Sequence, residues 1–188
     1  MAVSERQKRA VHRGDWGVKG GWVHWPWNVW RPDRYDPFQQ HWGVDVVPGA
    51  VTPHQPGKEG PANYQPDAVD VAILAPMNGV VVRTRDDGNV GGFFNDTLIE
   101  YRVRSLDYPR DRVYVLYGHL KPNGIIQTNH QVGAGDKIAE IGTKSLSLDE
   151  IIHTHVQVWW DRDDALNYHH PTTKNPMDLW RAIKQHVS

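Results

Sequence analysis

A series of short apolar segments, rich in Val and Ile and separated by turn residues, limits the fold of this chain most strongly. β-branched and aromatic residues in runs of this length are typical of strands. The segments are FQQHWGVDVV (38–47), VAIL (71–74), GVVVRTR (79–85), TLIEYRVRS (97–105), RVYVLYGHL (112–120) and IIHTHVQVWW (151–160). The pattern therefore predicts a mainly β protein, an antiparallel sheet or sandwich of at least six strands.

The 188 residues predict one domain with extensions at both ends. Residues 1–37 are expected to form a Trp-rich arm packed across the domain, and residues 38–160 form its body. In the extension 161–188, Asn175 and Pro176 predict the start of a short C-terminal helix over about 176–186. The Pro/Gly-rich stretch 48–68 is expected to be a long loop, and long loops in compact domains often carry function.

Composition removes several functional classes. The chain has no Cys, so disulfides and thiolate ligands are excluded, and a bound metal must use His and carboxylate. Its 21 basic and 22 acidic residues are mixed along the chain, which gives no overall field to attract nucleic acid or anionic lipid. No segment approaches the ~20 apolar residues that span a bilayer, and the N-terminus lacks the apolar run of a secretory signal.

Three motifs bring together side chains that bind metals or transfer protons. His41 and Asp45 are expected on one face of an extended segment, since side chains alternate with period two and Gly43 favours extended chain. His153 and His155 share one face of the last predicted strand for the same reason. His119 stands at a strand end, in Tyr-Gly-His-Leu, from which its side chain can reach a cleft.

Taken together and in this order, HxxxD, the strand-end His and HxH resemble the zinc peptidases of the lysostaphin and LytM type. APMNGVVV and VGAGDKIAEIG are similar to that family's strand-turn-strand and to its glycine-rich hairpin. The resemblance covers roughly residues 38–160 and implies a zinc metallopeptidase domain there. The stretch 143–150 departs from the Gly, Ser and Thr usual in the family, and because it is expected to border the cleft, substrate preference is open.

Carried over residue by residue, the resemblance implies that His41, Asp45 and His155 bind one Zn²⁺ ion. It implies that His119 and His153 act on the attacking water and the developing oxyanion, without deciding which of them is the base. Two imidazoles and one carboxylate suit tetrahedral zinc and leave one position open, as catalytic sites do.

The same resemblance implies an endopeptidase acting on peptide bonds of bacterial peptidoglycan, in a cross-bridge or a stem peptide. Two alternatives remain: a non-catalytic module of this fold that binds peptidoglycan or another partner, and a zinc peptidase with a substrate outside the wall. An extracellular or cell-envelope location is expected from the resemblance. No signal peptide is visible, and such a location would then require a processed chain, a phage-encoded lysin or another export route. The sequence leaves the oligomeric state open.

The remaining histidines are expected to be surface or packing residues: His12, His24, His54, His130, His169, His170 and His186. The Trp cluster of residues 22–42 is expected to pack under the arm rather than bind a glycan. One further hypothesis concerns latency, in which His24 or Asn28 of the arm would occupy the open zinc position.

Overall fold

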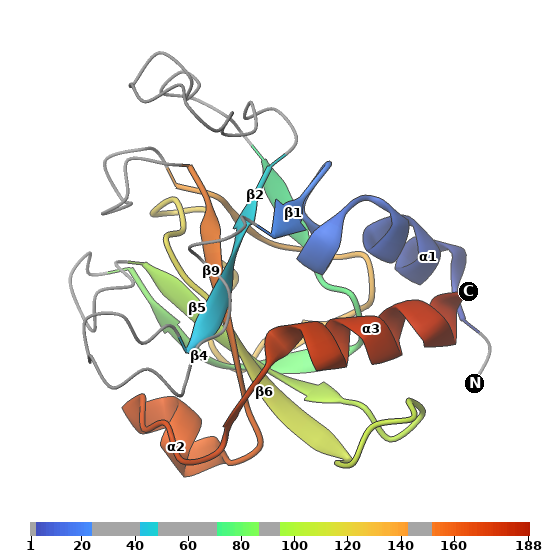
Figure 1. Cartoon of the computed structure of the whole chain (residues 1–188). Helices are drawn as coiled ribbons and strands as arrows, with labels where there is room; N and C mark the ends of the chain where they lie inside the picture. The colour runs from blue at the N-terminus through green and yellow to red at the C-terminus, as the bar shows by residue number, and fades with distance from the viewer. Residues whose placement is uncertain (1–2, 24–41, 49–70, 87–94, 143–151) are drawn as a thin grey trace, which may run out of the picture.

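The computed structural model describes residues 3–23, 42–48, 71–86, 95–142 and 152–188 (Figure 1). Within these ranges the strands are β1 (Trp22–Val23), β2 (Gly43–Val47), β3 (Ala72–Leu74), β4 (Gly79–Arg85), β5 (Asp96–Arg102), β6 (Arg112–Tyr117), β7 (Gln131–Val132), β8 (Lys137–Glu140), β9 (Thr154–Trp159) and β10 (Thr173–Lys174). The helices are α1 (Glu5–His12), α2 (Arg162–Asn167) and α3 (Pro176–Val187), with a short 3-10 helix at Asp15–Gly17. The predicted arm beyond residue 23, the loop 48–68 beyond its first residue and the stretch 143–150 lie outside the described residues.

Eight strands form one antiparallel sheet in the order β1-β2-β9-β6-β5-β4-β7, with β10 pairing beside β9. β3 and β8 form a second sheet of two strands. β2 and β10 share one edge of β9: β2 pairs with its first part and β10 with its end. The mainly antiparallel class predicted from the sequence is confirmed, and so is the C-terminal helix, whose first turn Asn175 caps by accepting a hydrogen bond from the Met177 amide.

The Gly-Ala-Gly-Asp turn at 133–136 has a different role from the hairpin that the resemblance predicted. β7, before the turn, pairs with β4, whereas β8, after it, pairs with β3. The turn therefore carries the chain from the large sheet to the small one. At Gly135, φ is +85° and a Cβ would stand 2.8 Å from the Arg6 carbonyl oxygen, so the turn also admits close contact with α1.

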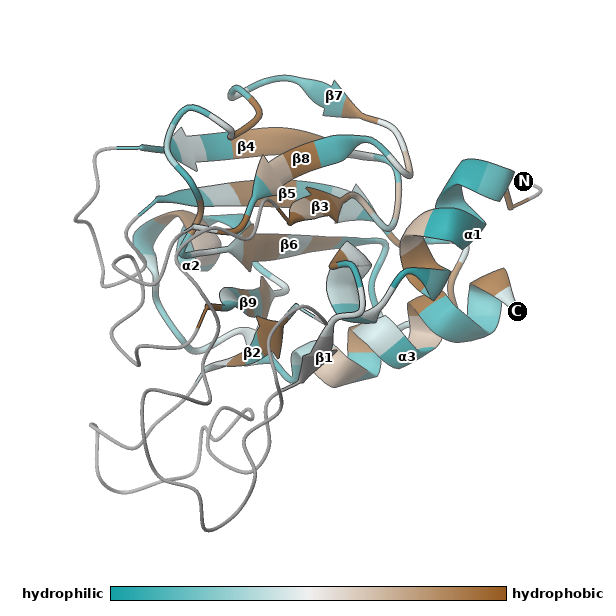
Figure 2. Ribbon diagram, turned by 90° about the horizontal axis from the view of Figure 1, so that it is seen from above, coloured by the Kyte–Doolittle hydropathy of each residue, from teal (hydrophilic) through white to brown (hydrophobic). Residues whose placement is uncertain are grey.

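The two faces of the large sheet bury different clusters. Apolar residues, brown in Figure 2, recur along its strands. Alternate residues such as Val46 of β2 and Val156 of β9 join the main core together with residues of β3, β8 and α3. On the opposite face, Trp159 and Ala165 belong to a smaller cluster that lies under α2. Because side chains alternate along a strand, Asp45, His155 and Trp159 share this second face.

The helix α1 was missed by the sequence analysis, which treated residues 1–37 as a Trp-rich arm. Ser4 caps it by accepting a hydrogen bond from the Gln7 amide at 3.1 Å, yet only Ala10 and Val11 among its residues are buried. Most of its eight residues are charged or polar, so the segment does not stand out in the sequence as a helix that faces a core. α1 contacts α3, and the two termini lie on that side of the molecule (Figure 1). None of the described helices is long and apolar enough to cross a membrane.

Two tryptophans anchor the N-terminal segment to α3. Trp16 is fully buried, and its ring stacks on that of Trp180 with centroids 5.3 Å apart. The Trp180 indole N–H donates to Asp15 Oδ1 at 2.8 Å. The segment before the predicted β body therefore contributes to the core.

We expect Trp180→Phe to lower the free energy of unfolding by about 2 kcal/mol, because it removes a hydrogen bond to a carboxylate and leaves space beside Trp16. Urea unfolding measures the change. Trp160→Phe is the matched control, since the Trp160 indole donates to the Tyr108 hydroxyl at a longer 3.3 Å and the ring is only half-buried. Equal losses in the two variants would contradict the anchoring role.

Candidate functional site

The register of β2 against β9 places Asp45 directly opposite His155. Their side chains meet on the same face, with Asp45 Oδ1 3.0 Å from His155 Nδ1. Both are almost fully buried, at 2% and 5% exposure. Burial of a carboxylate is costly unless a proton donor or a cation compensates it; the imidazole beside Asp45 can supply the former and a metal ion the latter.

His153 and His119 complete a compact group with this pair. His153 Nε2 lies 3.6 Å from the same oxygen of Asp45, and its ring meets that of His119 edge to face, with centroids 4.6 Å apart. The His119 ring is 6.3 Å from that of His155. The structure thus brings four of the five predicted site residues together; the fifth, His41, lies outside the described residues.

The backbone around His119 explains how its ring reaches the group. His119 has φ +57°, in the left-handed region that is strained for a residue with a Cβ. Backbone hydrogen bonds hold this conformation: the Gly142 amide donates to the His119 carbonyl, and the Leu120 amide donates to the Asn95 carbonyl. The buried Asn95 side chain also donates to the Leu120 carbonyl at 2.9 Å. Asn95 therefore acts as a clamp on the turn that presents His119.

Asn95→Ala is expected to lower the free energy of unfolding by about 1–3 kcal/mol, since it leaves the buried Leu120 carbonyl without this donor. Chemical denaturation tests this, with Asn167→Ala as control because the Asn167 amide bonds only an exposed carbonyl, that of Asp163. Zinc affinity is expected to stay unchanged in both variants. If Asn95→Ala is as stable as Asn167→Ala, Asn95 does not hold the turn that presents His119.

Gly43 gives the His155 ring its space. A Cβ at this position would stand 2.4 Å from His155 Nε2 and 2.5 Å from the Val156 carbonyl oxygen. Sequence reasoning interpreted Gly43 only as a residue that favours extended chain. Its structural role is to let the imidazole lie against the backbone of β2.

The sequence analysis missed three residues next to this group. Gln157, fully buried two residues after His155, places Oε1 3.4 Å from His155 Nε2. Its Nε2 lies 3.3 Å from Nδ1 of His170, whose ring stacks on Trp42 with centroids 4.4 Å apart and planes 3° from parallel. The period-two spacing of Gln157 from His155 was the one available signal. Nothing in the sequence links His170 to β9.

The other histidines divide between surface and packing. His12, His130 and His169 are exposed and His186 is half-buried, in agreement with expectation. His170 packs as expected but also reaches the polar chain behind His155. His24 and His54 lie outside the described residues, as does Asn28, so the latency hypothesis stays a prediction.

Among the described residues no group of three or more His, Asp or Glu side chains is arranged to hold a metal. Of the three predicted ligands, Asp45 and His155 lie in the described part of the chain.

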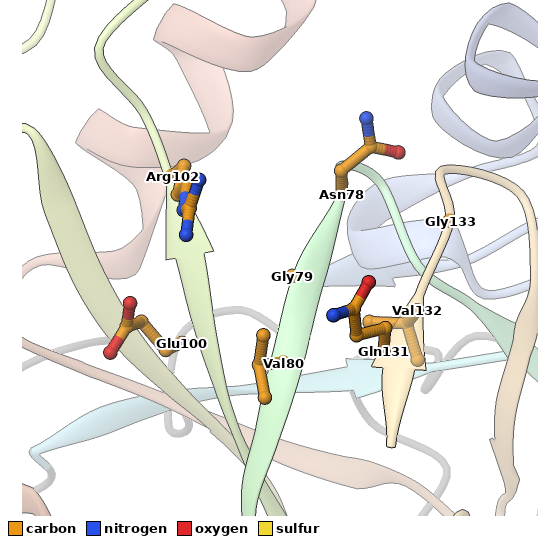
Figure 3. A pocket seen from close by; sticks show the side chains of 8 residues that line it. All are labelled: Asn78, Gly79, Val80, Glu100, Arg102, Gln131, Val132 and Gly133. Carbon is orange, nitrogen blue, oxygen red and sulfur yellow. The ribbon is translucent and has the colours of Figure 1, made fainter. Parts of the chain in front are cut away.

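A hollow of about 490 Å³ lies elsewhere, at the β4–β5–β7 side of the sheet (Figure 3). It is lined by Asn78, Gly79, Val80, Glu100, Arg102, Gln131, Val132 and Gly133, none of which is a predicted site residue. The Glu100 carboxylate is already engaged by Arg112 at 3.2 Å and by the Tyr114 hydroxyl. The hollow therefore offers a partly polar surface that is separate from the histidine group.

The architecture is that of the lysostaphin-type peptidase domains, as the sequence resemblance predicted. In particular, it matches the catalytic domain of the antimicrobial peptidase lysostaphin from Staphylococcus simulans with a TM-score of 0.52 and 15% identity, over 83% of this chain and 90% of that one. Lysostaphin itself matches with a TM-score of 0.53 and 14% identity, over 86% of this chain and 50% of that one. The structure of LytU matches with a TM-score of 0.50 and 19% identity, over 84% of this chain and 82% of that one. No family model matches the sequence, nor does any curated protein.

Proposed function

We propose that this protein is a zinc-dependent endopeptidase that hydrolyses peptide bonds of bacterial peptidoglycan. The observation that carries the proposal is the buried contact of Asp45 with His155, with His153 and His119 beside it. Four titratable side chains gathered at one point are costly to bury for packing alone. Such groupings are typical of functional sites.

The donor set fits zinc. Ligand atoms about 2.0–2.2 Å from a tetrahedral zinc ion are roughly 3.3–3.6 Å from each other, a little more than the 3.0 Å between Asp45 Oδ1 and His155 Nδ1. His41, four residues before Asp45 on the adjoining segment, is the proposed third ligand. Bound zinc would supply a water of lowered pKa and would polarise the scissile carbonyl.

The chain's own residues then divide the proton transfers. A neutral His153, next to Asp45, accepts the proton of the attacking water and passes it to the leaving amine. His119, whose ring meets His153 edge to face, donates a hydrogen bond to the oxyanion that develops on the substrate carbonyl.

The substrate class rests on the likeness of the fold to lysostaphin, whose printed description is that of an antimicrobial peptidase. One fold hosts several functions, so the substrate is a proposal of its own. Activity at the cell envelope or outside the cell follows from it and is proposed together with it.

Release of new amino groups from purified peptidoglycan sacculi tests the proposal. Zinc-loaded protein is compared with a chelated sample and with His153→Ala, which keeps the proposed ligands. We expect amines only from the intact, metal-loaded protein, and mass analysis of the fragments then names the bond.

Two negative outcomes separate the alternatives. Zinc binding without amine release, combined with retention of the protein on sacculi, would favour a binding module of this fold. Cleavage of other peptides but not of sacculi would leave a zinc peptidase with a different substrate. Amine release that survives both chelation and His153→Ala would overturn the mechanism.

A further inference from the structure

A polar chain leads from the proposed metal ligands to the C-terminal extension. It runs from Asp45 through His155 and Gln157 to His170, with successive contacts of 3.0, 3.4 and 3.3 Å. His155 and Gln157 stand on β9, whereas His170 comes from the segment between α2 and β10. The pairing of β10 with the end of β9 returns this segment to the edge that β2 also uses.

The last member of the chain determines the orientation of the others. Burial lowers the pKa of the His170 imidazole, and the neighbouring His169 lowers it further, so His170 is neutral near neutral pH and its Nδ1 can accept a hydrogen bond. Its face-to-face stack on Trp42 fixes the ring plane. The Gln157 amide lies with its NH₂ group towards His170 and its oxygen towards His155, an orientation that an accepting Nδ1 on His170 supports.

An amide oxygen at His155 Nε2 selects one tautomer of that ring. Nε2 carries the hydrogen and donates it to Gln157, which leaves the lone pair of Nδ1 directed at Asp45 Oδ1. In this tautomer the 3.0 Å contact is favourable only with a metal ion between the two atoms, whereas a proton on Nδ1 would satisfy Asp45 without metal. Gln157 thus favours the tautomer that can ligate, in competition with Asp45 in the metal-free protein.

We infer that Gln157, held in place by His170, is a positioning residue that fixes His155 in the tautomer that ligates through Nδ1. This inference rests on the proposed metal site and goes beyond it, because it assigns a role in the site to the C-terminal extension. Partners of this kind behind ligating histidines are typically worth 10–100-fold in metal affinity.

The test compares Gln157→Leu with Gln157→Glu. Leu removes the acceptor, so the zinc-free protein is expected to shift His155 to the tautomer that donates from Nδ1 to Asp45. Glu keeps an oxygen towards His155, and His170 can change its own tautomer to donate to it. Two-bond ¹H–¹⁵N spectra, with the His155 signals assigned from His155→Ala, report which nitrogen carries the proton. Competition with a chelator reports zinc affinity, expected to fall about 10–100-fold for Leu and to be restored by Glu.

Neither readout involves peptidoglycan, so the inference and the proposed activity fail separately. A tautomer shift in Gln157→Leu without any amine release from sacculi by the wild type would support the positioning role and reject the peptidase. An unshifted tautomer together with wild-type zinc affinity in Gln157→Leu would overturn the inference. If Gln157→Leu does not fold, His170→Phe is the alternative variant, because it keeps a ring on Trp42 but removes the acceptor for the Gln157 amide. An unchanged His155 tautomer in His170→Phe would also overturn the inference.

Discussion

His155→Ala is expected to abolish tight zinc binding, with a loss of affinity well beyond the roughly 100-fold upper range for a residue behind the ligands. The variant removes the Nδ1 ligand and also leaves the buried Asp45 carboxylate without its 3.0 Å partner. A fall in the unfolding free energy of the metal-free protein by about 3 kcal/mol is therefore expected as well, because one member of a buried pair is lost. Chelator competition and urea unfolding measure the two effects.

His130→Ala is the matched control for this loss, because His130 is exposed and lies outside the group around Asp45. Both quantities are expected to match the wild type in the control. Zinc binding by His155→Ala at wild-type affinity would remove His155 from the ligand set and, with it, the basis of the proposed function.

Gly43→Ala is expected to displace the His155 ring and to separate β2 from β9 locally. The added methyl group would stand 2.4 Å from His155 Nε2 and 2.5 Å from the Val156 carbonyl oxygen, and the backbone oxygen cannot move without the strand. Overpacking of this kind costs about 1–3 kcal/mol, which thermal unfolding would detect. Zinc affinity is expected to fall about 10–100-fold, as it does when a ligating histidine loses its support.

The control for this substitution is Gly124→Ala. A Cβ at Gly124 would meet its nearest atom, the Lys121 carbonyl oxygen, at an ordinary 3.6 Å. The same chemical change is therefore made without a clash, and no measurable effect is expected. If both variants bind zinc and unfold like the wild type, the close approach of His155 to β2 is wrong.

Strand positions were predictable because each strand is short, apolar and bounded by turn residues. GVVVRTR at 79–85 coincides with β4, and the alternation in HTHVQVW correctly put His153 and His155 on one face. The C-terminal helix was equally predictable, since Asn175 and Pro176 mark its start. These features depend on local sequence, which a single chain displays directly.

Partnership between strands was not predictable in the same way. The apolar runs on either side of Gly133–Asp136 suggested a hairpin, but β7 and β8 join different sheets. Which strand pairs with which depends on how the whole core closes. The helix α1 was not predicted for a related reason, since its buried side packs against α3, which is far away in the sequence.

The site residues likewise fall into those that local sequence predicts and those that depend on tertiary contacts. Motif spacing found Asp45, His119, His153 and His155, which the structure brings together. It did not find Gln157, whose meaning comes from His170, or Asn95, which bonds a carbonyl 25 residues away. It also undervalued Gly43, because the space that Gly43 provides is visible only once β2 lies against β9.

Asp45 and His155 are 110 residues apart in the sequence, and only the finished pairing of β2 with β9 brings them together. The unfolded chain therefore offers no preformed site, and a metal held there would bind the native state alone. Its binding energy would add to the stability, by about 2.7 kcal/mol at a free concentration 100 times the dissociation constant. Interactions formed after the folding barrier slow unfolding without speeding folding. Such an ion would act as a latch that closes last, lengthening the lifetime of the folded protein more than it helps the chain to reach that state.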